Sequence, residues 1–235
     1  MLKPLLEQEL LIKYSHIVGV DEVGRGCLAG PVVAAAACFF DWTLIPGIRD
    51  SKKLSRPQRE NLTKIIPSKA YVGYGVVSSS EIDEINIHQA TRKAMTIALL
   101  SVFQSNGGGS CPTSPPTDGF GAVAPAGARW LAPSGGHPTA LLACVLIDGI
   151  IKLDIPYSQQ SIIKGDAVCY SIAAASIMAK VYRDQLMFDY DKIYPGYGLS
   201  QHVGYPTEIH KKALCNLGLT SIHRKTFRGV KEHVS

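Results

Sequence analysis

The chain of 235 residues lacks the signals of several common protein classes. Its six cysteines form no Cys-x-x-Cys pair, and none lies at a zinc-binding spacing from a histidine, which excludes the usual zinc modules. No stretch is apolar enough to cross a bilayer. The chain begins without a secretory leader, because the apolar residues 10–12 are too few and Glu7 and Glu9 precede them. We therefore expect a cytoplasmic protein with reduced thiols and no membrane segment.

Charged residues are unevenly distributed. Residues 105–140 are rich in glycine, proline and serine and hold only one acid and one base. Such a composition cannot bury enough apolar surface to order itself, so we expect a disordered insertion there. From Lys192 onward acids are few: seven Lys or Arg residues stand against two Glu residues, and the difference equals the net charge of +5 of the whole chain. A basic end suits a polyanionic substrate, and a solvated basic tail is the alternative.

Apolar runs and helix signals predict an α/β domain with an appendage. Five apolar runs predict strands, at residues 16–23, 31–40, 70–77, 141–147 and 160–163. Helical spacing predicts helices at residues 81–103, 166–190 and 207–217, and Ser55 with Gln58 predicts another helix start. The short glycine-bearing links between the first three strands favour antiparallel neighbours. We divide the chain into a main domain, residues 1–190, and a basic helical segment, residues 191–235.

Four carboxylates lie where predicted strands end or a predicted helix begins. Asp21 and Glu22 end one apolar run, Asp148 ends another, and Asp166 precedes the long helix. Each has an ordinary structural interpretation: a solvated turn for the pair, an Asp-Gly turn for Asp148, and an N-cap for Asp166. Together they form the ligand set of a two-metal phosphodiester site, in which the ions activate water and stabilise the leaving oxygen, so no special nucleophile is needed.

Short motifs follow one another along the chain. They are VGVDEVGRG (18–26), LAGPVVAAA (28–36), DSKKLS (50–55), EIDEINI (81–87), LIDG (146–149), IKGD (163–166), SIAAASIMAKVYRD (171–184), YPGYGL (194–199), GYPT (204–207) and IHRKTF (222–227). In this order they resemble the motifs of the bacterial ribonuclease HII family. The similarity covers almost the whole chain except residues near 104–140, where the family usually has a short connection.

The resemblance implies a fold, an activity and a cofactor. The fold is the α/β ribonuclease H-like fold: a mixed five-stranded sheet flanked by helices, with a small helical C-terminal appendage, and residues 1–190 are its catalytic domain. The activity is that of an endonuclease that hydrolyses the RNA strand of RNA/DNA hybrids and cuts at single ribonucleotides in duplex DNA, leaving 5′-phosphate and 3′-hydroxyl ends. Asp21, Glu22, Asp148 and Asp166 would be the catalytic residues and the ligands of two divalent ions, Mg²⁺ or Mn²⁺. We expect a monomer whose partners are these nucleic acids.

The resemblance also implies a substrate-binding set. Its expected members are Gly24, Arg25, Gly26, Lys52 and Tyr205. The glycines of the triplet let the backbone approach a ribose 2′-hydroxyl, and Arg25 reaches a phosphate. Tyr205 matches the tyrosine that stacks on the sugar at an RNA–DNA junction, and a packed aromatic is the alternative. Lys52 is the expected phosphate contact.

Three positions depart from the family pattern, none of them at a proposed metal ligand. Cys27 and Leu219 replace the usual prolines, and Val203 replaces a lysine, which removes a phosphate contact. Two alternative functions stay open. One is a related nuclease without junction specificity, against which Arg25 in the triplet argues. The other is a hybrid-binding protein without catalysis, against which the four acids argue.

Two groups of polar residues in the C-terminal half have less definite roles. Lys180, Arg183 and Asp184 lie off the apolar stripe of the long helix, so we expect them to be exposed or to face the substrate. A second group consists of His202, His210 and His223. No cysteine accompanies these histidines at a suitable spacing, so we expect them to be solvated or to contact phosphate rather than to bind zinc.

Overall fold

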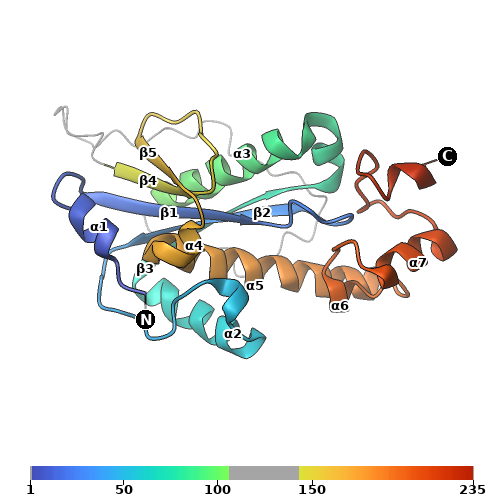
Figure 1. The fold of residues 1–235 in the computed structure, drawn as a ribbon, viewed down its shortest axis with the longest axis horizontal. Helices are drawn as coiled ribbons and strands as arrows, with labels where there is room; N and C mark the ends of the chain where they lie inside the picture. Colours follow the sequence, from blue (N-terminus) through green and yellow to red (C-terminus); the bar gives the residue numbers. More distant parts are fainter. Residues whose placement is uncertain (1, 106–142, 235) are drawn as a thin grey trace.

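A computed structural model of the protein describes residues 2–105 and 143–234, and Figure 1 shows their arrangement. Five strands form one sheet in the order β3-β2-β1-β4-β5. They are β1 (His16–Val23), β2 (Val32–Phe39), β3 (Ala70–Val77), β4 (Ala143–Asp148) and β5 (Ser158–Ile162). Strands β1 to β3 pair antiparallel, whereas β4 runs parallel to both β1 and β5. The predicted mixed five-stranded sheet is therefore confirmed, with β5 beginning two residues before its predicted start.

The helices lie on both faces of this sheet (Figure 1). The long ones are α3 (Ser79–Ser105) on one face and α5 (Tyr170–Ile193) on the other. The shorter ones are α1 (Leu5–Leu10), α2 (Arg56–Ile65), α4 (Gly165–Val168), α6 (Leu199–His202) and α7 (Glu208–Leu217). Three short 3-10 turns complete the set, at Ser51–Lys53 (η1), Ile66–Ser68 (η2) and Lys231–His233 (η4). No helix in the described ranges combines the length and the apolar character that a membrane span needs.

Strand β2 is the centre of the core because all eight of its residues are buried. Side chains alternate along a strand, so Ala34 and Ala36 pack under α3 while Ala35 and Ala37 pack under α5. Such small residues let the helices come close to the sheet. At Gly19 of β1 the approach is so close that a Cβ there would lie 2.2 Å from the carbonyl carbon of Ser171. The first turn of α5 therefore rests directly on β1, next to Asp21.

The two long predicted helices both differ from the prediction. The helix expected from residue 166 to 190 is broken at Cys169, whose backbone is extended (φ −110°, ψ 127°) and whose side chain is buried against Ile17 and Leu146. Because of the break, the backbone N–H at the start of α5 is free to bind Glu7. Glu7 belongs to α1, a helix that the sequence analysis did not predict. Glu7 Oε1 accepts hydrogen bonds from the Ser171 backbone N–H at 2.8 Å and from its hydroxyl at 2.9 Å.

Helix α3 is kinked where the prediction had one continuous helix. At Asn86 the backbone leaves the helical region (φ 67°, ψ 162°). Its side-chain Oδ1 accepts from the backbone N–H groups of His88 and Gln89, at 3.0 and 3.1 Å, so Asn86 caps the second part of the helix. The predicted insertion at residues 105–140, apart from its first residue, lies outside the described residues.

The C-terminal segment with α6 and α7 packs against the far end of α5 (Figure 1). Its own small core contains Met187 and Tyr190 of α5, Leu199 of α6, Leu214 of α7 and Leu28 of the β1–β2 loop. A loop of the main sheet and the end of the chain therefore share one hydrophobic cluster. The predicted helix at residues 207–217 is present, with Thr207 as its N-cap.

Candidate active site

Four acids meet at one edge of the sheet because of its strand order. Strands β1 and β4 are parallel, and Val20 is paired with Ile147, so the residues that follow, Asp21 and Asp148, are neighbours. Asp166 lies in α4, directly after β5, which runs parallel to β4. The backbone N–H of Gly165 donates to Asp148 Oδ1 at 2.6 Å and so joins the two segments. We call Asp21, Glu22, Asp148 and Asp166 the acidic edge.

Burial makes this cluster electrostatically costly. Asp21 is 5% exposed and Asp166 is 6% exposed. Burial raises the pKa of Asp21 well above its ordinary value, the neighbouring charge of Glu22 raises it further, and a hydrogen bond to Ser176 lowers it in part. Burial is also the main reason why the pKa values of Glu22 and Asp148 are raised. The fold thus holds like charges together in a place where only a cation relieves their repulsion.

Lys52 and Arg25, two members of the predicted substrate-binding set, form ion pairs with these acids. Lys52 Nζ is 3.2 Å from Asp166 Oδ2, and the Lys52 side chain is 83% exposed. Arg25 Nη1 is 3.2 Å from Glu22 Oε1, and its side chain is 46% exposed. In each pair the cation is exposed although its acid is largely buried, so water and a substrate phosphate can both reach the cation. The Lys52 ammonium and the Arg25 guanidinium therefore lie where they can bind either an acid of the site or a phosphate of a substrate.

The acidic edge suits a hard divalent cation. All four donors are carboxylates, the ligand type that Mg²⁺ and Mn²⁺ prefer. Glu22 Oε2 is buried and has no hydrogen-bond partner in the described part of the chain, and a cation would satisfy it. Within residues 2–105 and 143–234, no three His, Cys, Asp or Glu side chains already converge as a finished ligand set. The backbone N–H of Gly165 donates to one oxygen of Asp148, and Lys52 donates to one oxygen of Asp166, so a bound ion would share these carboxylates with the two donors or displace them.

Two buried serines below the acids were missed by the sequence reasoning. The hydroxyls of Ser51 and Ser176 lie 2.9 Å apart and are hydrogen bonded, and Ser176 also bonds to Asp21. Ser176 is 6% exposed in an alanine-rich stretch of α5. The available signal was this single hydroxyl within an otherwise apolar stretch, residues 172–179, since a buried polar group needs a partner.

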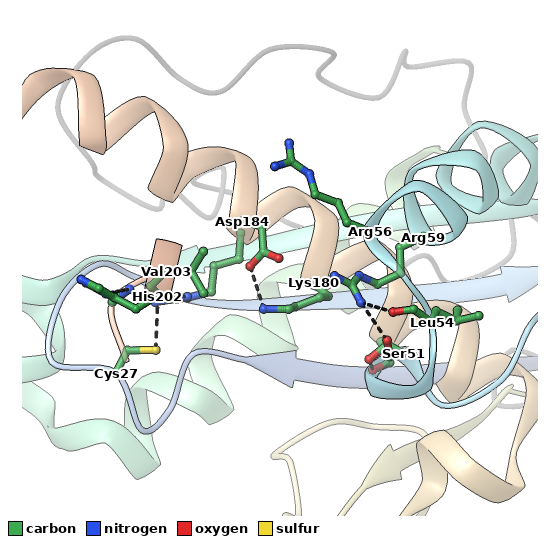
Figure 2. A network of polar contacts seen from close by, with 12 residues as sticks. Cys27, Ser51, Leu54, Arg56, Arg59, Lys180, Asp184, His202 and Val203 are labelled. Carbon is green, nitrogen blue, oxygen red and sulfur yellow. Dashed lines mark hydrogen bonds and ion pairs between the residues drawn. The ribbon is translucent and has the colours of Figure 1, made fainter. Parts of the chain in front are cut away.

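Two residues that we expected to be exposed or to face the substrate lie further along α5. Lys180 and Asp184 follow Ser176 at intervals of one helical turn, and Lys180 Nζ is 2.8 Å from Asp184 Oδ1. The same ammonium lies 5.9 Å from the ring centroid of Tyr205. In Figure 2 Lys180 lies between Ser51 and the pair formed by Cys27 and Val203. This face of α5 therefore connects the acidic edge with Tyr205.

The glycine triplet and Tyr205 belong to segments that are bonded together. The backbone N–H of Leu28 donates to the carbonyl of Gly204 at 2.8 Å, and the Cys27 thiol lies 3.7 Å from the Val203 carbonyl (Figure 2). Tyr205 is 39% exposed, so its ring is accessible on one side. The structure thus places the triplet, Tyr205 and the acids on connected elements.

Two of the sequence predictions about polar residues are wrong. Arg183 is not exposed: its guanidinium is fully buried and donates to backbone carbonyls. The three histidines are not solvated either, with exposures of 7%, 0% and 1% for His202, His210 and His223. The reason is that α6, α7 and residues 220–224 fold onto one another, a contact between segments that no local pattern reveals.

The three histidines form one cluster of hydrogen-bonded and stacked rings. The Nε2 atoms of His210 and His223 lie 3.1 Å apart, and the rings of His202 and His210 are stacked with centroids 4.4 Å apart. Burial, together with the neighbouring imidazoles, lowers the pKa of both His210 and His223 to about 4. At neutral pH the rings of His210 and His223 therefore act as hydrogen-bonded packing groups and carry no charge that attracts phosphate.

The sequence and the fold both match known proteins. A family model described as ribonuclease HII matches residues 18–121 and 139–230. Ribonuclease HII of Geobacter sulfurreducens is 43% identical over 222 residues, which covers 94% of this chain and 86% of that protein. Ribonuclease HII of Geotalea uraniireducens is 44% identical over 236 residues, covering 98% and 92%.

Two solved structures share the fold at low identity. Ribonuclease H2 from Pyrococcus horikoshii has a TM-score of 0.63 and 22% identity, with coverage of 92% of this chain and 96% of that one. Bst-RNase HIII, in a crystal structure with Mn²⁺, has a TM-score of 0.58 and 19% identity, with coverage of 93% and 68%.

Proposed function

The chain belongs to the ribonuclease HII family, and we propose that the acidic edge is its catalytic site. The protein is a metal-dependent endoribonuclease that cleaves RNA in RNA/DNA hybrids and cuts at ribonucleotides in DNA. The observation that carries the site is the meeting of four carboxylates from β1, β4 and α4 at one sheet edge, two of them buried and two partly buried, beside an exposed lysine and arginine. A buried acidic cluster costs stability, so a fold keeps it for chemistry that needs it.

We propose that the four acids hold two divalent ions, Mg²⁺ or Mn²⁺. When bound, such ions supply charge neutralisation and an activated water to phosphodiester hydrolysis. Asp21 and Asp148 would hold them from adjacent parallel strands, and Glu22 would contribute the buried oxygen that has no protein partner. The side chains of Lys52 and Arg25 would then leave the acids and bind phosphates on either side of the cut, which leaves 5′-phosphate and 3′-hydroxyl ends.

We assign recognition of the ribonucleotide to the residues around Tyr205. They lie at the end of the α5 face with Lys180 and Asp184, away from the acidic edge. The backbone of Gly24 and Gly26 would read the ribose 2′-hydroxyl, and Tyr205 would stack on the sugar at the junction. Support comes from the accessible ring of Tyr205 and from its connection to the triplet through Leu28 and Gly204. In this assignment residues 1–190 are the catalytic domain, and residues 191–235 complete the substrate surface.

We also propose that the protein works as a monomer in the cytoplasm. The described cysteines support a reducing compartment, since all five are free thiols and four of them are buried. The expected partners are RNA/DNA hybrids and duplex DNA that contains ribonucleotides.

One experiment tests the function directly. The protein is incubated with duplex DNA carrying a single ribonucleotide, with Mg²⁺ or Mn²⁺, and the product ends are mapped. We expect a cut beside the ribonucleotide with 5′-phosphate and 3′-hydroxyl ends, stopped by EDTA and restored by excess metal. Tight binding of this substrate without any cut in either metal would instead support the hybrid-binding alternative.

A further inference from the structure

Two buried arginines behind the glycine triplet have no acidic partner. Arg183 and Arg224 are both 0% exposed, and neither forms an ion pair with an acid in the described part of the chain. Burying a charged guanidinium without a counter-ion is costly, so each of them needs an unusually complete set of hydrogen-bond acceptors. In this protein the acceptors are backbone carbonyls.

Arg224 binds two carbonyls of the loop between β1 and β2. Its Nε and Nη2 donate to the Gly30 carbonyl at 3.0 and 2.8 Å, and its Nη1 donates to the Arg25 carbonyl at 2.9 Å. The second acceptor belongs to the middle residue of the recognition triplet. The orientation of that peptide is therefore fixed from below by a residue of the C-terminal segment.

Arg183 connects both parts of the proposed recognition surface. Its Nε donates to Pro31 O at 2.9 Å and its Nη2 to Ala29 O at 3.2 Å, both in the β1–β2 loop. Its Nη1 donates to Val203 O at 2.8 Å, two residues before Tyr205. One rigid, planar group thus sets the spacing between the triplet loop and the tyrosine segment.

The backbone around Arg183 leaves no room for another arrangement. Gly24 has a φ of +94°, and a Cβ at this position would lie 2.1 Å from Arg183 Nε. Glycine is therefore required at the first triplet position by the guanidinium behind it as well as by the turn. At Gly204 a Cβ would lie 2.5 Å from the Ala29 carbonyl oxygen, so the two segments are in direct backbone contact.

From these contacts we infer that Arg183 and Arg224 are positioning residues for ribonucleotide recognition. We call them, with residues 24–31 and 203–205, the recognition clasp. The inference rests on the proposed function of the triplet and Tyr205, and it adds the groups that hold both at one spacing. Neither arginine touches the substrate. Each acts through the carbonyls of the segments that do, and Lys cannot replace either, because an ammonium lacks the planar fork that reaches two or three separate acceptors.

The test uses variants that keep the positive charge and remove the fork. Arg183→Lys and Arg224→Lys are assayed on two substrates, duplex DNA with a single ribonucleotide and a long RNA/DNA hybrid. Hydrogen bonds from charged groups are strong enough that we expect kcat/KM on the single ribonucleotide to fall about tenfold or more relative to the hybrid. The hybrid offers many registers, so an imprecise clasp harms it less. The Mg²⁺ concentration for half-maximal activity should stay unchanged.

Arg59 provides a matched control. Its Nη1 also donates to two backbone carbonyls, Ser51 O at 3.1 Å and Leu54 O at 2.6 Å, but in the segment that carries Lys52 (Figure 2). Arg59→Lys therefore removes an arginine fork outside the recognition clasp. We expect it to leave the ratio of the two activities unchanged, whatever its effect on either activity alone.

A second variant keeps the test decisive if a lysine variant does not fold. Gly204→Ala disturbs the contact with Ala29 and leaves both guanidiniums in place, and it should lower the same ratio. Ratios equal to that of the wild type in the folded Arg183, Arg224 and Gly204 variants would overturn the inference. A wild-type protein that cuts neither substrate would instead overturn the proposed function, so the two failures are distinguishable.

Discussion

The acidic edge and the recognition clasp solve opposite electrostatic problems. At the acidic edge four buried or partly buried carboxylates repel one another, and they are positioned by regular pairing of β1 with β4 and of β4 with β5. In the clasp two buried guanidiniums lie among backbone carbonyls, and they position a loop that belongs to no regular element. In the proposed function the charge at the first site binds an incoming cation, whereas the charge at the second site is satisfied by carbonyls of the protein itself.

The comparison explains why the two sites respond differently to change. Metal ligands act on every phosphodiester that enters the site, so their loss should lower all activities together. The clasp sets the geometry of one recognition event, so its loss should change the preference among substrates.

Removal of one metal-ligand charge should have the largest effect. Asp21→Asn and Asp148→Asn should each lower kcat by at least about a hundredfold, since charge neutralisation at the reacting phosphate is lost. Both the single-ribonucleotide substrate and the long hybrid should be affected equally. Steady-state kinetics with saturating Mg²⁺ measure this, and near-normal turnover in either variant would remove that residue from the site.

Loss of the stacked ring should affect one substrate more than the other. Tyr205→Ala should lower cleavage at a single ribonucleotide by about ten- to a hundredfold, the value of one stacked aromatic, with a smaller loss on the hybrid. Tyr205→Phe keeps the ring and should remain close to the wild type. Equal losses on both substrates, or a changed Mg²⁺ dependence, would mean that Tyr205 is a packing residue.

The metal-free protein should gain stability when one acid is neutralised. The pKa of Asp21 in the folded protein is raised well above 3.8, so folding favours the protonated carboxyl. The stability of the folded protein is therefore highest below pH 3.8 with respect to this group, and it falls as the pH rises through the raised pKa and the buried carboxyl becomes charged. Asp21→Asn should therefore raise the melting temperature by a few degrees (roughly 1 kcal/mol or more) at pH 7.5 in EDTA. Asp154→Asn, at an exposed acid, is the control and should change nothing. A lower melting temperature for Asp21→Asn would show that its charge is already compensated.

The histidine cluster beside the clasp should show the opposite pH dependence. The folded pKa of His210 and His223 is lowered from 6.5 to about 4, so their contribution is present above pH 6.5 and is lost as the pH falls toward 4. We expect the wild-type melting temperature to fall between pH 7 and pH 5, and His223→Gln to reduce that fall. Thermal unfolding in EDTA at both pH values measures it, and an identical fall in the variant would show that other groups cause it.

Much of the acidic edge could be predicted from local sequence because each acid follows its own strong signal. Asp21 and Asp148 end buried strands, and Asp166 follows Gly165 at a helix start, so chain position alone suggested their roles. The substrate-binding roles expected for the triplet and Tyr205 came from the resemblance to the family motifs. Ser176 was missed because a single serine in an alanine-rich helix has no pattern of its own.

The clasp shows why the remainder could not be predicted. Arg183 lies off the predicted apolar stripe of α5 and was expected to be exposed or to face the substrate, yet its acceptors are at residues 29, 31 and 203. Arg224 is 199 positions away from Arg25, whose carbonyl it binds. Burial of a charged side chain depends on which distant carbonyls surround it, and this information exists only in the packed chain.

The sequence by itself determined the strands, the family and the acids, because periodicity and motifs are properties of neighbouring residues. Tertiary structure alone decided that Arg183 and three histidines are buried, that the long helix breaks at Cys169, and that Lys52 lies on Asp166. The physical reason is the range of the interactions involved. Backbone hydrogen bonding and apolar periodicity act within a few residues, whereas burial and charge compensation act between segments that only the fold brings together.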